Sequence, residues 1–409
     1  MKTALYPRLA WDGLRKNKRL FTPYLLTCVC MVMMFYILSF LGSPETCALL
    51  PRGSNTTGKI LNLGSFVIFV FSAIFLYYTN SFLVRRRERE FGLYNVLGMN
   101  KRNLARIVTW ESLITAVLSL VLGLALGIVL SKLAELGLVN MLGGDINYRI
   151  RIDVDSLTRA LGLYAIIFTV IWLSTVVRVG RSSAVALLRS ESVGEKPPKS
   201  QWLLVIPGLA LLLGAYYIAA TINDPVQAML LFFLAVIMVI LSTYLLFISG
   251  SVTLCKTLQK DEKFYYKKRN FVSLSSLTYR MKRNGAGLAS ICILSTMVLV
   301  MLASTASLYF GAEDAINTLA VQNHWHPTEM ADVRAEFFSL YGSLFFLGIL
   351  LSVLFLFATL LMLYYKQVVE GYEDASRFAI MQRVGMTKRD IRESVNAQML
   401  LIFLLLMPL

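Results

Sequence analysis

The stretch ILNLGSFVIFVFSAIFLYYTNSFLVRRRERE, residues 60–90, decides the fold class of this chain. Its first part, residues 60–83, carries no charged side chain. A helix of about 20 apolar residues is long enough to cross the hydrocarbon core of a bilayer. The block of arginines and glutamates that follows is excluded from that core by its cost of desolvation, so it marks where the helix leaves the membrane.

Similar apolar runs recur along the 409 residues, of which 57% are hydrophobic and 16% charged. We predict an all-α fold, a polytopic bundle of transmembrane helices. The eight complete spans are expected near residues 20–42, 60–83, 107–131, 156–177, 202–221, 226–250, 286–311 and 337–365. A further run from about residue 395 to Leu409 is too short for a crossing, so we expect the last helix of the bundle to be missing.

Positive charge is concentrated in alternate gaps between these runs. Segments 1–19, 84–106, 178–201, 251–285 and 366–394 hold 33 of the 40 Lys and Arg residues. Basic loops are retained on the cytoplasmic side during insertion, so we predict a multi-pass plasma-membrane protein with a cytoplasmic N-terminus. Topology and anionic lipids then explain the net charge of +16, and we expect no nucleic-acid partner.

The predicted spans carry no ionisable side chain deep in their interior. A secondary transporter usually keeps such groups along its ion path, so this alternative class is disfavoured; it would show ATP-independent uptake.

Gly123 and Gly127 form a GxxxG pair in the third span, and this spacing predicts close packing against another helix.

Two parts of the chain repeat one pattern. With Phe91 aligned to Phe378, GMNKRNL at 98–104 falls on GMTKRDI at 385–391. Each copy predicts a charged helix, a turn at Gly, and a new helix capped by Asn or Thr. We therefore predict two four-helix repeats, at 1–190 and 262–409. A linker with a two-helix insert, at 191–261, joins them.

The cytoplasmic loops of the two repeats, 84–106 and 366–394, keep apolar residues at matching positions, although a basic loop needs none. Either a partner protein docks on these residues, as in a helix-in-groove contact, or they dip into the membrane surface.

The sequence RRREREFGL at 85–93, continued by VLGM at 96–99, resembles the cytoplasmic loop of FtsX-like ABC transporter permeases. The sequences LYYKQVVEGYED at 363–374 and RFAIMQRVGM at 377–386 are similar to the bacitracin-export-type permeases of Gram-positive bacteria. The resemblance implies that each repeat is an FtsX-like four-helix unit, and that the family's large extracellular domain is reduced here to a short remnant at 312–336.

The resemblance also implies a non-catalytic membrane subunit without a cofactor of its own, which pairs with a separate ATPase homodimer that binds ATP and Mg²⁺. ATP-driven mechanotransmission would then confer resistance to, or sensing of, cell-wall-targeting antimicrobial peptides such as bacitracin. A membrane sensor histidine kinase and undecaprenyl-linked cell-wall intermediates or other membrane lipids are further implied partners. The implied contacts with the ATPase, called the coupling residues below, are Glu90, Phe91, Gly92, Leu97, Gly98, Met99, Arg377, Phe378, Ala379, Val384, Gly385 and Met386.

An alternative within the same superfamily is a regulator of cell-wall hydrolases, or a handler of lipids or lipoproteins, that transports no peptide.

Two other motifs are set aside as candidate nucleotide and metal sites. GSNTTGKI at 53–60 lacks the final Ser or Thr of a P-loop. His324, His326 and Glu329 all come from one short loop, so we expect no metal site there.

Overall fold

The computed structural model of the protein is built from helices, as predicted, and contains no strand in its described residues. These residues are 5–49, 54–142, 151–181, 202–221, 225–260, 268–323 and 327–383, with the single positions 387 and 396. Contacts divide the chain into two compact units, which are described separately: unit 1 comprises 1–194 and 298–357, and unit 2 comprises 195–297 and 358–409.

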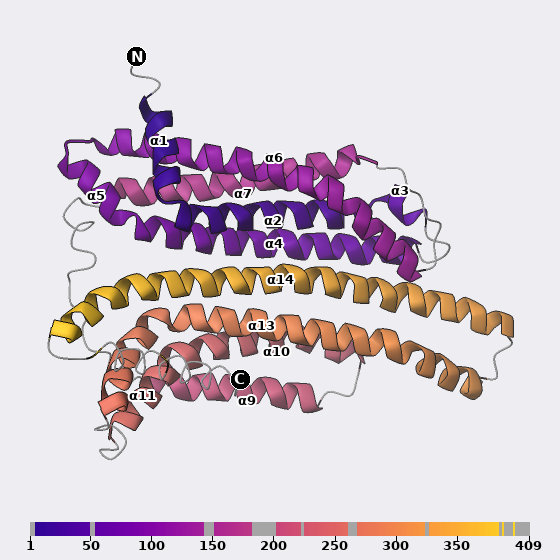
Figure 1. The fold of residues 1–409 in the computed structure, drawn as a ribbon. Helices are drawn as coiled ribbons and strands as arrows, with labels where there is room; N and C mark the ends of the chain where they lie inside the picture. Colours follow the sequence, from indigo (N-terminus) through magenta and orange to yellow (C-terminus); the bar gives the residue numbers. More distant parts are fainter. Residues whose placement is uncertain are drawn as a thin grey trace. The chain divides into compact units, whose positions relative to one another are not determined.

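Unit 1 contains four long helices that lie side by side in alternating directions, α2, α4, α6 and α7 (Figure 1). Its helices are α1 (Leu5–Lys16), α2 (Lys18–Leu41), α3 (Pro44–Cys47), α4 (Ser54–Arg86), α5 (Glu88–Val96), α6 (Lys101–Leu142) and α7 (Val154–Arg181). At 1.5 Å per residue, the 42 residues of α6 extend about 60 Å, roughly twice the thickness of the hydrocarbon core. Helix α6 therefore projects beyond the membrane.

Helix α2 forms the centre of unit 1. It is apolar on all sides, as expected of a helix surrounded by other helices, and it packs against α4, α6 and α7. Tyr164 of α7 donates a hydrogen bond of 2.8 Å to the carbonyl oxygen of Met31 in α2. The Tyr164 hydroxyl lies 2.9 Å from that of Ser72 in α4, so three helices share one buried hydrogen-bonded group.

The two glycines of the GxxxG pair face α2. A Cβ atom on Gly123 would lie 2.7 Å from Cβ of Val32 and 3.0 Å from the carbonyl oxygen of Val29. A Cβ atom on Gly127 would lie 3.0 Å from the ring of Tyr36. Hydrogen in place of a side chain lets the two backbones approach closely, and dispersion contacts then replace the hydrophobic effect that lipid surroundings do not supply.

Two further helices, α13 (Lys268–Asn323) and α14 (Pro327–Arg383), contribute to both units. In unit 1, the hydroxyl groups of Thr57 in α4 and Ser343 in α14 lie 2.7 Å apart. The rings of Tyr309 in α13 and Phe345 in α14 stack with their centroids 5.2 Å apart. These contacts tie the α13–α14 hairpin to unit 1.

Unit 2 contains α9 (Trp202–Thr221) and α10 (Pro225–Leu245), which pack against each other, followed by a π-helical turn (Leu246–Gly250) and α11 (Ser251–Lys260). The first part of α13 packs closely on this turn, because a Cβ atom on Gly285 would lie 3.0 Å from Cα of Ile248. The structure thus interrupts the predicted span 226–250 with a π-helical turn.

Seven helices of the described residues are long and apolar enough to cross a membrane. They include seven of the eight predicted spans; the remaining one, 226–250, is covered by α10 and the π-helical turn, of which Leu234–Gly250 is the part found to be an apolar helix. The first residues of the expected linker, 191–201, and the run from 395 lie outside the described residues, apart from position 396. The segment 312–336 is helical up to Asn323 and again from Pro327, because α13 and α14 continue past their apolar spans.

We expect Gly123→Ala to lower the free energy of unfolding by about 1–3 kcal/mol, because the added methyl group overlaps Val32 and Val29. Gly162→Ala is the matched control: it lies in α7 with no atom within 4 Å of an added Cβ, so its effect is neutral or slightly stabilising. Melting of the two purified variants in detergent measures the difference. Equal stability of the two variants would show that α2 and α6 do not depend on this close approach.

Candidate functional site

The basic segments of unit 1 come together at one end of its bundle, called the basic end below. Helices α1 and α5 lie at this end, with the start of α6 and the end of α7 (Figure 1). Described cationic residues at the basic end are Arg8, Arg15, Lys16, Lys18, Arg19, Arg87, Lys101, Arg102, Arg106, Arg178 and Arg181. The predicted loop 84–106 is folded here as a short helix, α5, between two long ones.

A Schellman motif joins α5 to α6 and confirms the turn expected at Gly98. The N–H of Met99 donates to the carbonyl of Tyr94, and the N–H of Gly98 to that of Asn95, at 2.9 and 3.1 Å. Gly98 has a φ of +89°, in the left-handed region that glycine occupies without strain. The chain restarts at Asn100, whose carbonyl accepts the first bonds of α6.

A buried ion pair fixes the start of α5. The guanidinium of Arg87 donates from both terminal nitrogens to the carboxylate of Glu111 in α6, at 2.6 and 2.8 Å. Its Nε donates to Glu90 of α5 at 3.0 Å. Arg87 and Glu111 are only 3% and 4% exposed. The planar fork of arginine matches a carboxylate at two points, so this pair fixes the orientation of α5 as well as its distance from α6.

Two aromatic rings complete the surroundings of the guanidinium. The Cζ atom of Arg87 lies 5.1 Å from the ring centre of Phe21 and 5.0 Å from that of Phe91. Burial opposes the charge of Arg87, but the carboxylates of Glu111 and Glu90 outweigh it and raise the pKa of Arg87 above its ordinary value. Arg87 therefore stays cationic at every physiological pH and anchors the start of α5.

The same cluster reaches α1. Asn17, between α1 and α2, donates from Nδ2 to Glu90 at 2.7 Å. Gly13 of α1 comes so close to the cluster that a Cβ atom there would lie 2.8 Å from Oε1 of Glu111. The cluster thereby connects α5 to both the N-terminal helix and α6.

The predicted coupling residues of the first loop divide into buried and exposed ones. Phe91 is 2% exposed and packs in a cluster with Val84, Leu104, Val108 and Val179, and Gly92 is also buried. Glu90 and Met99 are half-buried, whereas Leu97 and Gly98 are exposed. The accessible apolar face of α5 and its turn, called the α5 ridge below, consists of Leu93, Val96 and Leu97, which are 55%, 63% and 74% exposed.

The coupling residues of the second loop are only partly described. Arg377, Phe378 and Ala379 fall within α14, but their side chains lie outside the described part. Val384, Gly385 and Met386 lie outside the described residues altogether, as do His324 and His326. The structure therefore brings together the first set of coupling residues and does not test the second.

Sequence reasoning missed Arg87, Glu111 and Asn17, as well as Leu93 and Val96 of the α5 ridge. Glu111 was visible as an acid near the start of the third predicted span, and it is buried there. Its partner was hidden, because Arg87 is one of several arginines in RRRER and only the fold shows that Arg87 points inward to Glu111.

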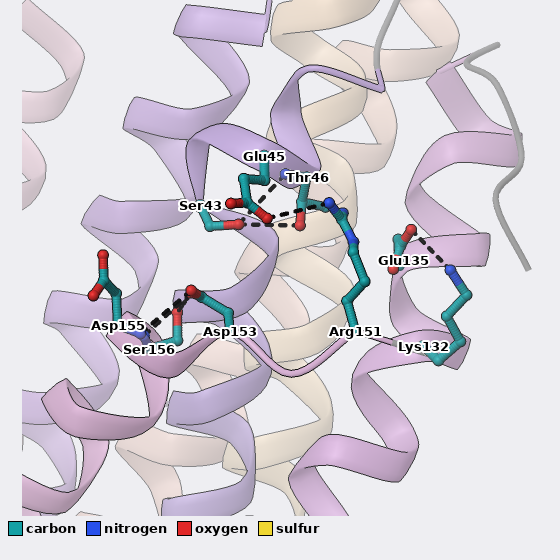
Figure 2. A network of polar contacts seen from close by, with 9 residues as sticks. All are labelled: Ser43, Glu45, Thr46, Lys132, Glu135, Arg151, Asp153, Asp155 and Ser156. Carbon is teal, nitrogen blue, oxygen red and sulfur yellow. Dashed lines mark hydrogen bonds and ion pairs between the residues drawn. The ribbon is translucent and has the colours of Figure 1, made fainter. Parts of the chain in front are cut away.

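Polar contacts at the opposite end of unit 1 are of a different kind (Figure 2). Arg151 pairs with Glu45 at 3.3 Å, and Lys132 with Glu135 at 2.9 Å. Asp153 accepts from the N–H of Ser156 at 3.1 Å and so caps α7. These contacts fix helix ends and connections. No group of three metal-binding side chains occurs among the described residues of the chain.

Residues 62–184 match the family described as FtsX-like permease C-terminal, a segment that contains α5 and most of its packing partners. The fold thus defines a helical, multi-pass membrane protein, and the family match confirms the resemblance to FtsX-like permeases for residues 62–184.

The chain is similar to ABC transporter permeases of Bacillus subtilis strain 168. It is 26% identical to the uncharacterized permease YvcS over 75% of this chain and 47% of that protein. It is also 26% identical to the bacitracin export permease protein BceB over 75% of this chain and 49% of that protein. The BceB protein of Halalkalibacterium halodurans is 28% identical over 62% of this chain and 40% of its own length. The chain spans about half the length of the curated relatives it matches.

Removing the cation of the buried pair should be costly. We expect Arg87→Gln to lower the free energy of unfolding by about 3–5 kcal/mol, because Glu111 is left as a buried charge without its partner. The matched control is Arg334→Gln, which breaks a pair of 2.7 Å with Glu313 whose side chains are 54% and 42% exposed, and should cost less than about 1 kcal/mol. Denaturation in mixed micelles measures both. If the two losses are alike, the Arg87 pair is no anchor.

Replacing Gly98 should strain the turn between α5 and α6. An alanine there keeps a left-handed backbone at a cost of about 1–2 kcal/mol. Gly180→Ala, at the same end of the bundle, serves as control, because an added Cβ meets nothing within 4 Å and its φ is not in the left-handed region. Hydrogen exchange of the α5 amides should accelerate in Gly98→Ala only. Unchanged protection of α5 would contradict the assigned role of this turn.

Proposed function

We propose that the chain is the membrane subunit of an ABC transporter and that the α5 ridge is where a separate ATPase docks. The supporting observation is an exposed apolar ridge, Leu93, Val96 and Leu97, on a helix that is held from behind by the Arg87–Glu111 pair. Because the short helix is rigidly anchored, a force that a partner applies to this contact surface is not lost in local deformation. The ATPase, and not this chain, would bind ATP and Mg²⁺ and carry out the hydrolysis.

Of the two interpretations of this loop, a docking surface or a segment that dips into the membrane, we favour the docking surface. The ridge lies in a basic segment beyond the apolar span of α4, which ends at Val84. Basic segments are retained in the cytoplasm, so we place the basic end and the N-terminus there. Apolar anchors on one face of a short helix fit the groove of a partner protein.

Motion of α5 has a defined route into the bundle. Glu90 is bonded to Asn17, and Arg87 to Glu111, so a force on α5 reaches α1 and α6 together. Helix α6 in turn packs on α2 through Gly123 and runs to the far side of the membrane. The proposed mechanism is mechanotransmission, in which helices carry the work of ATP hydrolysis across the bilayer.

The names of two relatives support a proposal for the substrate class. Both are named bacitracin export permeases, so we propose resistance to, or sensing of, cell-wall-targeting peptides, in a Gram-positive membrane. Undecaprenyl-linked lipids and a sensor histidine kinase are the further proposed partners. The second coupling set, Arg377 to Met386, is proposed as a second ATPase contact by its sequence repeat with the first.

A photo-crosslinking amino acid at Leu97 tests the docking assignment. In membranes of a host that carries the native neighbouring genes, it should capture a protein with nucleotide-binding P-loop and Walker B motifs. The same amino acid at Ile152, which is 59% exposed at the opposite end, should not. Capture of lipid alone at Leu97, or of the ATPase at Ile152, would contradict the assignment.

Substitution of the ridge tests its role in function. We expect Leu93→Ser with Leu97→Ser to reduce ATPase co-purification at least tenfold and to remove bacitracin protection, since both side chains are exposed and folding should survive. The matched control changes Ile152 and Val154, equally exposed apolar residues at the other end, to Ser. A normal ATPase association with no bacitracin phenotype in any strain would favour the cell-wall hydrolase regulator instead.

A further inference from the structure

A groove on the membrane-facing side of the basic end is not used by the proposed coupling mechanism. It has a volume of about 210 Å³ and lies between α1, α2 and α6. Its walls are mainly apolar, and Arg15 is the one charged side chain among the described residues that line it. The lining residues are Trp11, Leu14, Arg15, Phe21, Thr22, Leu25, Thr115 and Leu118.

The groove lies at the level where a lipid headgroup gives way to its acyl chains. Phe21 and Leu25 belong to the first turns of the apolar helix α2, and Leu118 belongs to the apolar part of α6. Helix α1 runs across the direction of the bundle helices, as a helix in the membrane surface does (Figure 1). Arg15, in the last turn of α1, is therefore placed at the headgroup level above an apolar slot.

Charge around the groove is strongly one-sided. Between Leu5 and Arg19 the chain carries five basic residues and one acid, Asp12. The basic residues are exposed: Arg8, Arg15, Lys16, Lys18 and Arg19. A peptide helix is about 10–12 Å across with its side chains and is too wide for a groove of this volume. Part of the length of one acyl chain fits into it.

We propose that this groove binds an anionic phospholipid of the adjacent leaflet, with an acyl chain against Phe21, Leu25 and Leu118 and the phosphate on Arg15. The guanidinium of Arg15 binds phosphate at two points, and its charge, with no acid among the described lining residues, favours a headgroup with net negative charge. A lipid bound here packs α1 onto α2 and α6. It lies beside Gly13 of α1 and Asn17, which follows α1, and both of these residues contact the Arg87 cluster.

Trp11 lines the groove and reports its occupant by fluorescence. The full chain is placed in phosphatidylcholine nanodiscs with increasing fractions of brominated phosphatidylglycerol or, separately, brominated phosphatidylcholine. Trp11 is 53% exposed in the native protein. The difference in quenching between the native protein and Trp11→Phe gives the signal of Trp11 separately from that of the other tryptophans. We expect brominated phosphatidylglycerol to reach half-maximal quenching at a mole fraction several times lower than brominated phosphatidylcholine.

Variants of two neighbouring cations separate a site from general attraction to a charged surface. Arg15→Gln should raise the half-maximal fraction of phosphatidylglycerol about fivefold, and Arg15→Lys should keep the preference. Lys16→Gln removes the same charge one residue away, outside the groove lining, and should change it less than twofold. Equal quenching by the two lipids, or equal effects of Arg15→Gln and Lys16→Gln, would overturn the proposal. The measurement needs no ATPase, so its outcome is independent of the proposed coupling function.

Discussion

The ion pair between Arg87 and Glu111 is the interaction on which the basic end of this protein depends. Both groups are almost fully buried, and each would be costly there alone. Their two-point hydrogen bonding, the third bond to Glu90 and the rings of Phe21 and Phe91 together satisfy the guanidinium. A buried pair of this kind contributes orientation more than net stability, and it is orientation that a coupling helix needs.

The rest of unit 1 extends that constraint through the membrane. Close packing at Gly123 holds α6 to α2, and the Tyr164 hydroxyl holds α7 and α4 to α2. Neither contact relies on a hydrophobic effect, which lipid surroundings do not provide. Small residues and buried hydroxyl groups thus join α2 to α4, α6 and α7, and in the proposed mechanism these contacts would carry a displacement along the helices.

The basic end presents two surfaces of different chemistry. The α5 ridge is apolar and lies beyond the membrane span, which suits a protein partner. The groove beneath α1 is apolar inside and cationic at its rim, which suits a lipid. Each surface belongs to a helix that contacts the Arg87 cluster, α5 through Glu90 and α1 through Gly13. The proposed ATPase and the proposed lipid therefore act on one shared structural element.

The sequence by itself determined the helical class, most of the spans, and the turn at Gly98, because span length, charge asymmetry and the left-handed preference of glycine are local or additive properties of the chain. It also indicated that Gly123 and Gly127 face a neighbour, without saying which one. Only the tertiary structure showed that Arg87, one of several adjacent arginines with the same local chemistry, meets Glu111. It likewise showed that Phe91 is buried while Leu93 and Leu97 are exposed, since burial on a short helix is set by what packs against it and not by its own residues.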